Sequence, residues 1–89
     1  MANILDELGL SYIPQYEIGG YRLDFLVNAA SGQRYDIEVD GDIHLTASAV
    51  EHDARRNAYV KSQGLKVLRF SARDIGLKSQ VIKDLLARI

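Results

Sequence analysis

The chain has 89 residues, a formal net charge of −1, 47% hydrophobic and 26% charged residues, and no cysteine. This length predicts one domain over residues 1–89 with a single core, and this composition excludes an intrinsically disordered protein. The lack of cysteine excludes disulfides, thiolate zinc sites and a cysteine nucleophile. Because the sequence has no apolar run of about twenty residues and no signal-peptide pattern, we expect a soluble, cytoplasmic protein without a membrane span. Because the chain is nearly neutral, any binding of nucleic acid must come from a local basic patch or from a larger assembly.

The N-terminal third predicts a short helix followed by a β-hairpin. Residues 2–8 carry apolar side chains at helical spacing, and Gly9 stops the helix. Residues 11–18 alternate as a strand does, and Pro14 places that strand at an edge of the sheet or in a bent entry to it. A pair of glycines then predicts a turn into a second strand over residues 21–27.

Asp24 is the anomaly of the second predicted strand, because its neighbours are aromatic and aliphatic. Burial of an unpaired carboxylate costs several kcal/mol, so such a residue needs a cationic partner. Arg22, on the same face of the strand, is one candidate partner, and a metal ion is the other.

A third strand, over residues 35–40, is predicted to follow a loop over residues 28–33. Alternation along this strand gives an apolar face and an opposite face made of three carboxylates: Asp36, Glu38 and Asp40. Such carboxylates repel one another and Asp is a poor strand former, so a cation should offset the repulsion. We interpret this acidic face as a site for a divalent metal, with His44 within reach after the turn at Gly41. The alternative is the solvated face of an edge strand.

A longer helix is predicted from Ser48, with Glu51 at the capping-box position, to about residue 63. Asp53 and Arg56 lie one turn apart on this helix and can form an ion pair with each other.

The C-terminal part predicts a short buried strand over residues 66–70 and an amphipathic closing helix over residues 77–89. The expected element order is therefore α-β-β-β-α-β-α, an α/β (α+β) fold.

Four ordered motifs run through nearly the whole chain. They are Gln15-x-x-Ile18 through Tyr21-Arg22-Leu23-Asp24-Phe25, Ile37-Glu38-Val39-Asp40-Gly41-x-x-His44, Asp53-x-x-Arg56, and Gly64-Leu65-x-Val67-Leu68-Arg69-Phe70. Their combination resembles the very-short-patch-repair-like (Vsr-like) branch of the restriction-endonuclease-like, PD-(D/E)XK superfamily, which includes EDxHD-type homing-endonuclease domains. The resemblance implies an αβββαβα core with a four-stranded mixed sheet flanked by helices.

The resemblance also implies a chemistry: Mg²⁺-dependent (or Mn²⁺-dependent) hydrolysis of phosphodiester bonds in DNA. It implies that Asp24, Glu38 and Asp40 bind the metal, with Asp40 standing where the wider superfamily has a lysine. His44 is then the best candidate for the general acid or base, because imidazole transfers protons near neutral pH. These four residues form the predicted catalytic set.

The same resemblance gives Asp53 and Arg56 supporting roles. Asp53 would orient His44, and Arg56 would tie the helix to the acidic strand or contact a phosphate. Arg22, Arg56 and Arg69 are the predicted nucleic-acid contacts. The sequence departs from the family where the first helix lacks its usual glutamate, and where Asp36 replaces the usual aliphatic residue.

Three functions therefore compete. The first is a DNA endonuclease module whose specificity comes from a partner domain, a partner chain or a homodimer. The second is a catalytically silent module with the same fold, for nucleic-acid or protein binding, which the neutral charge and the missing glutamate favour. The third is an interaction module whose acidic face binds calcium or a basic partner.

Overall fold

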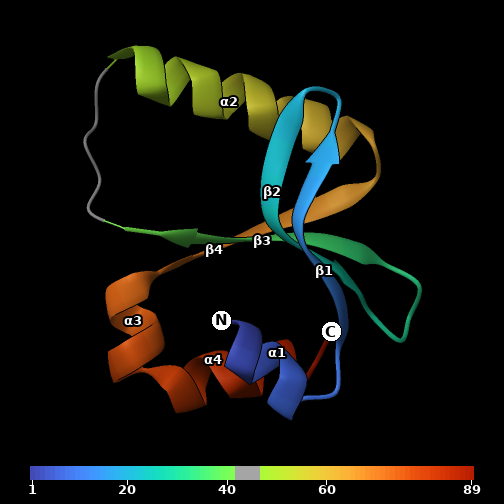
Figure 1. The fold of residues 1–89 in the computed structure, drawn as a ribbon, viewed down its shortest axis with the longest axis vertical. Coiled ribbons are helices and arrows are strands. Elements are labelled where there is room, and N and C mark those ends of the chain that lie inside the picture. The colour runs from blue at the N-terminus through green and yellow to red at the C-terminus, as the bar shows by residue number, and fades with distance from the viewer. Residues whose placement is uncertain (42–46) are drawn as a thin grey trace.

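The computed structural model describes residues 1–41 and 47–89, and within these ranges the chain forms a four-stranded sheet between two layers of helices (Figure 1). The elements in chain order are α1 (Ala2–Glu7), β1 (Ser11–Ile18), β2 (Tyr21–Asn28), β3 (Arg34–Asp40), α2 (Ala47–Ser62), β4 (Leu65–Ser71), α3 (Ala72–Leu77) and α4 (Ser79–Leu86). None of the described helices is long and apolar enough to cross a bilayer.

The sheet is mixed and its strands lie in the order β1-β2-β3-β4. The pairs β1–β2 and β2–β3 are antiparallel, whereas β3 and β4 are parallel. Parallel neighbours need a crossover connection, which includes α2. The predicted mixed sheet with flanking helices is thus confirmed, and β1, which contains Pro14, is an edge strand as expected.

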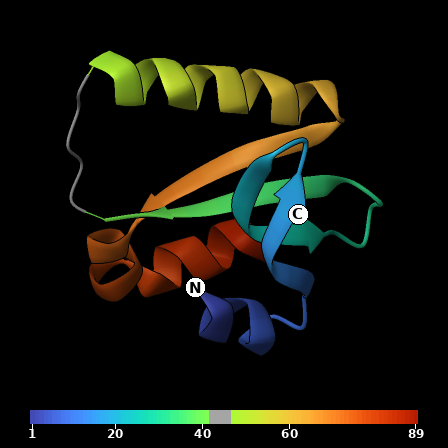
Figure 2. The same ribbon diagram turned by 45° about the horizontal axis from the view of Figure 1, so that its top comes forward.

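The helices cover both faces of the sheet. Figures 1 and 2 show α2 on one face and α1, α3 and α4 on the other. The core on the side of α1 and α4 contains these buried residues: Ile4, Leu5, Val27, Ala29, Tyr35, Ile37, Ile82 and Leu86. The smaller core on the α2 side contains Leu23, Leu26, Val60 and Leu65. Strand β3 is therefore covered on both faces, as strands between two helical layers are.

The C-terminal helix prediction is partly wrong, because residues 72–86 form two helices and not one helix from residue 77. Ser71 caps α3 by accepting a hydrogen bond from the backbone N–H of Asp74 at 3.0 Å, a cap that lies directly after β4. The chain leaves helical geometry at Lys78, with φ −125° and ψ 34°, before α4 begins. Ser48 likewise lies inside α2 and is not its cap.

Candidate metal and nuclease site

Strands β2 and β3 separate at Asp24 and Glu38. The backbone pairing of β2 with β3 runs from Asn28–Arg34 to Phe25–Ile37. At the next position, that of Asp24 and Glu38, hydrogen bonds from the backbone to side chains take its place. The backbone N–H of Asp24 donates to Glu38 Oε2 at 2.7 Å, and the backbone N–H of Val39 donates to Asp24 Oδ2 at 2.8 Å. Each strand thus holds the carboxylate of the other, and Asp24 and Glu38 form what we call the carboxylate pair.

An irregularity in β1 lies opposite Asp24. The β1–β2 ladder pairs Pro14 with Phe25 and Tyr16 with Leu23, and between them Gln15 has φ 54°, a left-handed conformation that costs a non-glycine residue energy. Strand β2 also changes its alternation here, because Leu23 and Leu26 lie in the same core although regular alternation would separate them. Asp24 is therefore placed at the point where the hairpin bends.

Arg56 connects α2 to the acidic strand. Its Nη2 lies 2.6 Å from Glu38 Oε1 and 3.1 Å from Asp36 Oδ2. Of the two predicted roles for Arg56, the structure shows the tie to the strand. Arg56 is 6% exposed and pairs with β3, so it does not form the predicted ion pair with Asp53.

Asp36 and Glu38 of the acidic face are buried and β3 is not an edge strand, so the alternative of a solvated edge strand is wrong. Asp36 is 0% exposed and Glu38 is 9% exposed, because β3 lies inside the sheet beneath α2. Asp36, Glu38 and Arg56 form what we call the buried triad. Asp36 Oδ1 has no hydrogen-bond partner in it. The pKa of the Glu38 carboxyl is raised from 4.5 to about 8, first by burial and then by Asp36, against the lowering effects of the Asp24 amide and of Arg56.

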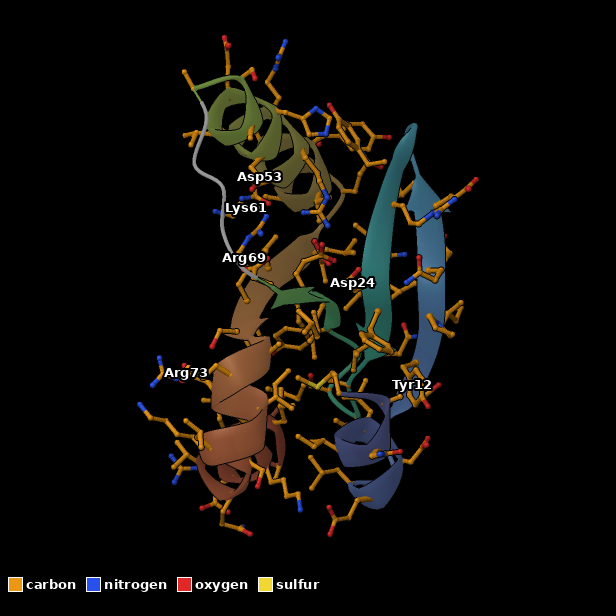
Figure 3. All side chains as sticks on the ribbon, turned by 60° about the vertical axis from the view of Figure 1, so that its left-hand side comes forward. Tyr12, Asp24, Asp53, Lys61, Arg69 and Arg73 are labelled. Atoms are coloured by element: carbon orange, nitrogen blue, oxygen red, sulfur yellow. The ribbon has the colours of Figure 1, made fainter. Side chains whose placement is uncertain are left out.

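Asp40 lies in a second polar cluster, with Arg69. Arg69 Nη1 donates to Asp40 Oδ1 at 3.1 Å, and Arg69 Nη2 lies 3.8 Å from Asp53 Oδ1. Figure 3 shows Arg69 on β4 on the side that faces Asp53 of α2. Asn57, which sequence reasoning missed, links both clusters because its Oδ1 accepts from Arg69 at 3.2 Å and from Arg56 at 3.3 Å. The available signal was its spacing, because Asn57 lies four residues after Asp53 and three before Val60 on the same stripe of the helix.

One further predicted residue, Arg22, lies apart from these clusters. Arg22 is exposed and its Nη2 lies 3.5 Å from Glu17 Oε1, so Arg22 is not the partner that holds Asp24. His44 belongs to residues 42–46 and lies outside the described residues.

The carboxylate pair fits a hard divalent cation. Among residues 1–41 and 47–89 no three Asp, Glu or His side chains gather as a complete metal cage. Mg²⁺ needs no such cage, because it is commonly held by one or two carboxylates and completed by water or phosphate oxygens. Each oxygen of the pair that accepts one hydrogen bond keeps a second lone pair for a cation. Asp24 and Glu38 are therefore suitable ligands.

Comparisons with known proteins agree with this architecture. Residues 1–89 match the family described as REase_MTES_1575. The uncharacterized protein YcjD of Escherichia coli (strain K12) is 37% identical over 70 residues, which are 79% of this chain and 56% of YcjD. The chain thus spans about half the length of this curated relative. The catalytic domain of the homing endonuclease I-Bth0305I superposes with a TM-score of 0.70 at 22% identity, over 96% of this chain and 83% of that domain, which shows a shared fold.

Proposed function

The chain belongs to the restriction-endonuclease-like family REase_MTES_1575, and from this membership we propose that it is a metal-dependent endonuclease that hydrolyses phosphodiester bonds in DNA. The observation that carries the proposal is the carboxylate pair, which lies where β2 and β3 separate. Each carboxylate accepts a hydrogen bond from a backbone N–H of the opposite strand, at 2.7 and 2.8 Å. A nuclease must fix its metal-binding carboxylates before the substrate arrives, and these bonds do so. The Vsr-like, EDxHD-type assignment and a role in DNA repair are proposed on the ordered motifs alone.

In this proposal Asp24 and Glu38 hold Mg²⁺ or Mn²⁺. A bound divalent ion would polarise the phosphoryl oxygen and lower the pKa of an attacking water. Arg56 fixes the Glu38 carboxylate through its 2.6 Å contact, and the Val39 amide fixes Asp24. Asp40 is proposed as a further ligand that Arg69 now holds at 3.1 Å, and His44 as the group that transfers the proton.

DNA contacts are proposed for three arginines. Arg22 is exposed at the β1–β2 turn and Arg69 is partly exposed at β4, so both can reach a phosphate. Arg56 is buried, so its proposed contribution is through Glu38 and not through direct contact. Since the interface of so small a chain is small, we propose that a partner domain, a partner chain or a second copy supplies site specificity.

The experiment that tests this function is nicking of supercoiled plasmid DNA in Mg²⁺ or Mn²⁺ by the wild type, Asp24→Asn and Glu38→Gln. Glu51→Gln is the matched control, because Glu51 is exposed on α2. We expect nicking by the wild type and the control, and its loss in both site variants. Equal nicking by the site variants would show that the activity comes from elsewhere.

A second candidate is a silent module of the same fold that binds DNA without cleaving it. The observation that favours it is that two of the three proposed ligands are paired with arginine: Glu38 with Arg56 and Asp40 with Arg69. Under this reading the wild type binds DNA at low salt and nicks nothing in either metal.

A further inference from the structure

Gln15 is the only non-glycine residue with a left-handed backbone among residues 1–41 and 47–89, with φ 54°. It belongs to the first of the four sequence motifs, and nothing in the proposed chemistry uses it. This conformation costs a glutamine energy, because it brings the Cβ too close to the following carbonyl oxygen. Such strain persists only where the surrounding structure imposes it. Gln15 is itself exposed, so the cause lies in the residues on either side of it.

Strand β1 changes faces at Gln15. Tyr12 packs against the core on the side of α1 and α4, whereas Tyr16 and Ile18 pack against the core on the α2 side. In a regular strand, residues four apart point to the same face, so Tyr12 and Tyr16 could not contact opposite cores. Figure 1 shows the β1–β2 hairpin running from the layer of α1 and α4 to α2. The left-handed residue between the two tyrosines therefore supplies the rotation that serves both cores.

Strand β2 changes faces at the same level. Phe25 packs against the core on the side of α1 and α4 and Leu23 against the core on the α2 side, although residues two apart share a face in a regular strand. Between the pairs Pro14–Phe25 and Tyr16–Leu23 lie Gln15 on one strand and Asp24 on the other. Asp24 thus lies within the rotation that both strands share, and there its carboxylate accepts the N–H of Val39 on β3 at 2.8 Å.

We propose that Gln15 is a positioning residue: its left-handed backbone sets the rotation of the hairpin that turns the Asp24 carboxylate toward β3. The contribution of Gln15 is its backbone conformation, because its side chain has no hydrogen-bond or ion-pair partner among the described residues. The use of Asp24 as a metal ligand rests on the proposed function. The orientation of Asp24 does not, so it can be tested without metal.

The first readout is amide hydrogen exchange in the metal-free protein, measured by NMR as the rate at Val39 relative to the rate at Ile37. Val39 donates to Asp24, whereas Ile37 is buried in the middle of the same strand. A general loss of stability does not raise exchange at Val39 above that at Ile37, but loss of the bond to Asp24 does.

The variants change the cost of the left-handed conformation at residue 15. Valine is β-branched and resists positive φ, so we expect Gln15→Val to raise the exchange ratio by about tenfold or more. Glycine adopts positive φ readily, so we expect Gln15→Gly to stay within about threefold of the wild type. Ser11→Val is the matched control, because Ser11 is exposed on the same strand and has no positive φ.

The second readout is Mn²⁺ affinity, measured by electron paramagnetic resonance. We expect Gln15→Val to bind Mn²⁺ at least about tenfold more weakly than the wild type, and Gln15→Gly to bind it within about threefold. Wild-type values of either readout in Gln15→Val would overturn the proposal. A raised exchange ratio or weak Mn²⁺ binding in Gln15→Gly would also overturn it, because the side-chain amide would then be what matters.

Two further outcomes are decided in advance. If Gln15→Val fails to fold, Gln15→Ala takes its place, because alanine keeps the Cβ that opposes positive φ, and an unchanged exchange ratio in it would overturn the proposal. A wild type that binds no Mn²⁺, or binds it no more tightly than Asp24→Asn, would defeat the metal site of the proposed function. The exchange ratios then still decide whether Gln15 turns Asp24.

Discussion

The Asp24 carboxylate is held by the backbone of the neighbouring strand: its Oδ2 accepts the N–H of Val39 at 2.8 Å. Asparagine keeps an oxygen in the same place and alanine does not. We expect Asp24→Ala to lower the free energy of unfolding by about 1–3 kcal/mol, because it leaves the Val39 amide without its acceptor. We expect Asp24→Asn to stay within about 1 kcal/mol of the wild type but to lose Mn²⁺ binding. Urea denaturation and Mn²⁺ titration of both variants measure the two effects separately.

Glu38 makes stability depend on pH, because its pKa is raised from 4.5 to about 8 in the folded protein. The folded state keeps this proton over a range in which the unfolded state has lost it. The contribution of protonated Glu38 to the free energy of unfolding is therefore fully present below pH 4.5. It is lost as the pH rises to about 8, by at most about 1.4 kcal/mol per pH unit.

Glu38→Gln is the reference for this pH effect, because an amide resembles the protonated carboxyl and does not titrate. We expect the free energy of unfolding of the wild type, relative to Glu38→Gln, to fall between pH 5 and pH 8, roughly the interval between the two pKa values. Chemical denaturation in metal-free buffer measures it. A difference that stays constant over this interval would show that Glu38 titrates at its ordinary value.

Arg56 anchors α2 through a buried contact to two carboxylates, and its loss leaves both without a cation. We expect Arg56→Met to lower the free energy of unfolding by about 3–5 kcal/mol. Arg55→Met is the matched control, because Arg55 is exposed on the same helix, and we expect a change within about 0.5 kcal/mol. Similar values for the two variants would show that the triad does not stabilise the fold.

Gly19, in the turn between β1 and β2, packs against Tyr59 of α2. A Cβ on Gly19 would lie 2.2 Å from the Tyr59 ring, and φ is 56°, whereas Gly20 has φ 81° and open space around it. We therefore expect Gly19→Ala to destabilise the protein by about 1–3 kcal/mol more than Gly20→Ala, which bears only the backbone cost. Thermal unfolding of both variants, each with and without Tyr59→Ala, measures the share that comes from the ring contact.

The strands and their order along the chain could be predicted because local patterns encode them: alternation gave the strands, and the glycine pair gave the hairpin. Adjacent antiparallel strands also bring Asp24 and Glu38 together, as the metal-binding set implied by the resemblance requires. The burial of Asp36 could not be predicted from β3 alone, because it depends on where α2 packs. The conformation of Gln15 gave no sequence signal, because its residue type does not favour positive φ. The Ser71 cap, by contrast, could have been predicted, because serine is a preferred N-cap residue and Ser71 stands directly before α3.

The two helical layers are attached unequally. Among the sixteen residues of α2, the buried ones are Arg56 and Val60, whereas α1 and α4 contribute four side chains to the larger core on the other face. Protection against native-state hydrogen exchange follows such burial, so the amides of α2 should exchange through a partial opening well below the global free energy of unfolding. Each such opening would withdraw the guanidinium from β3 and leave Glu38 without its counter-ion. The helix that holds the site in place is thus also the element whose detachment would expose it.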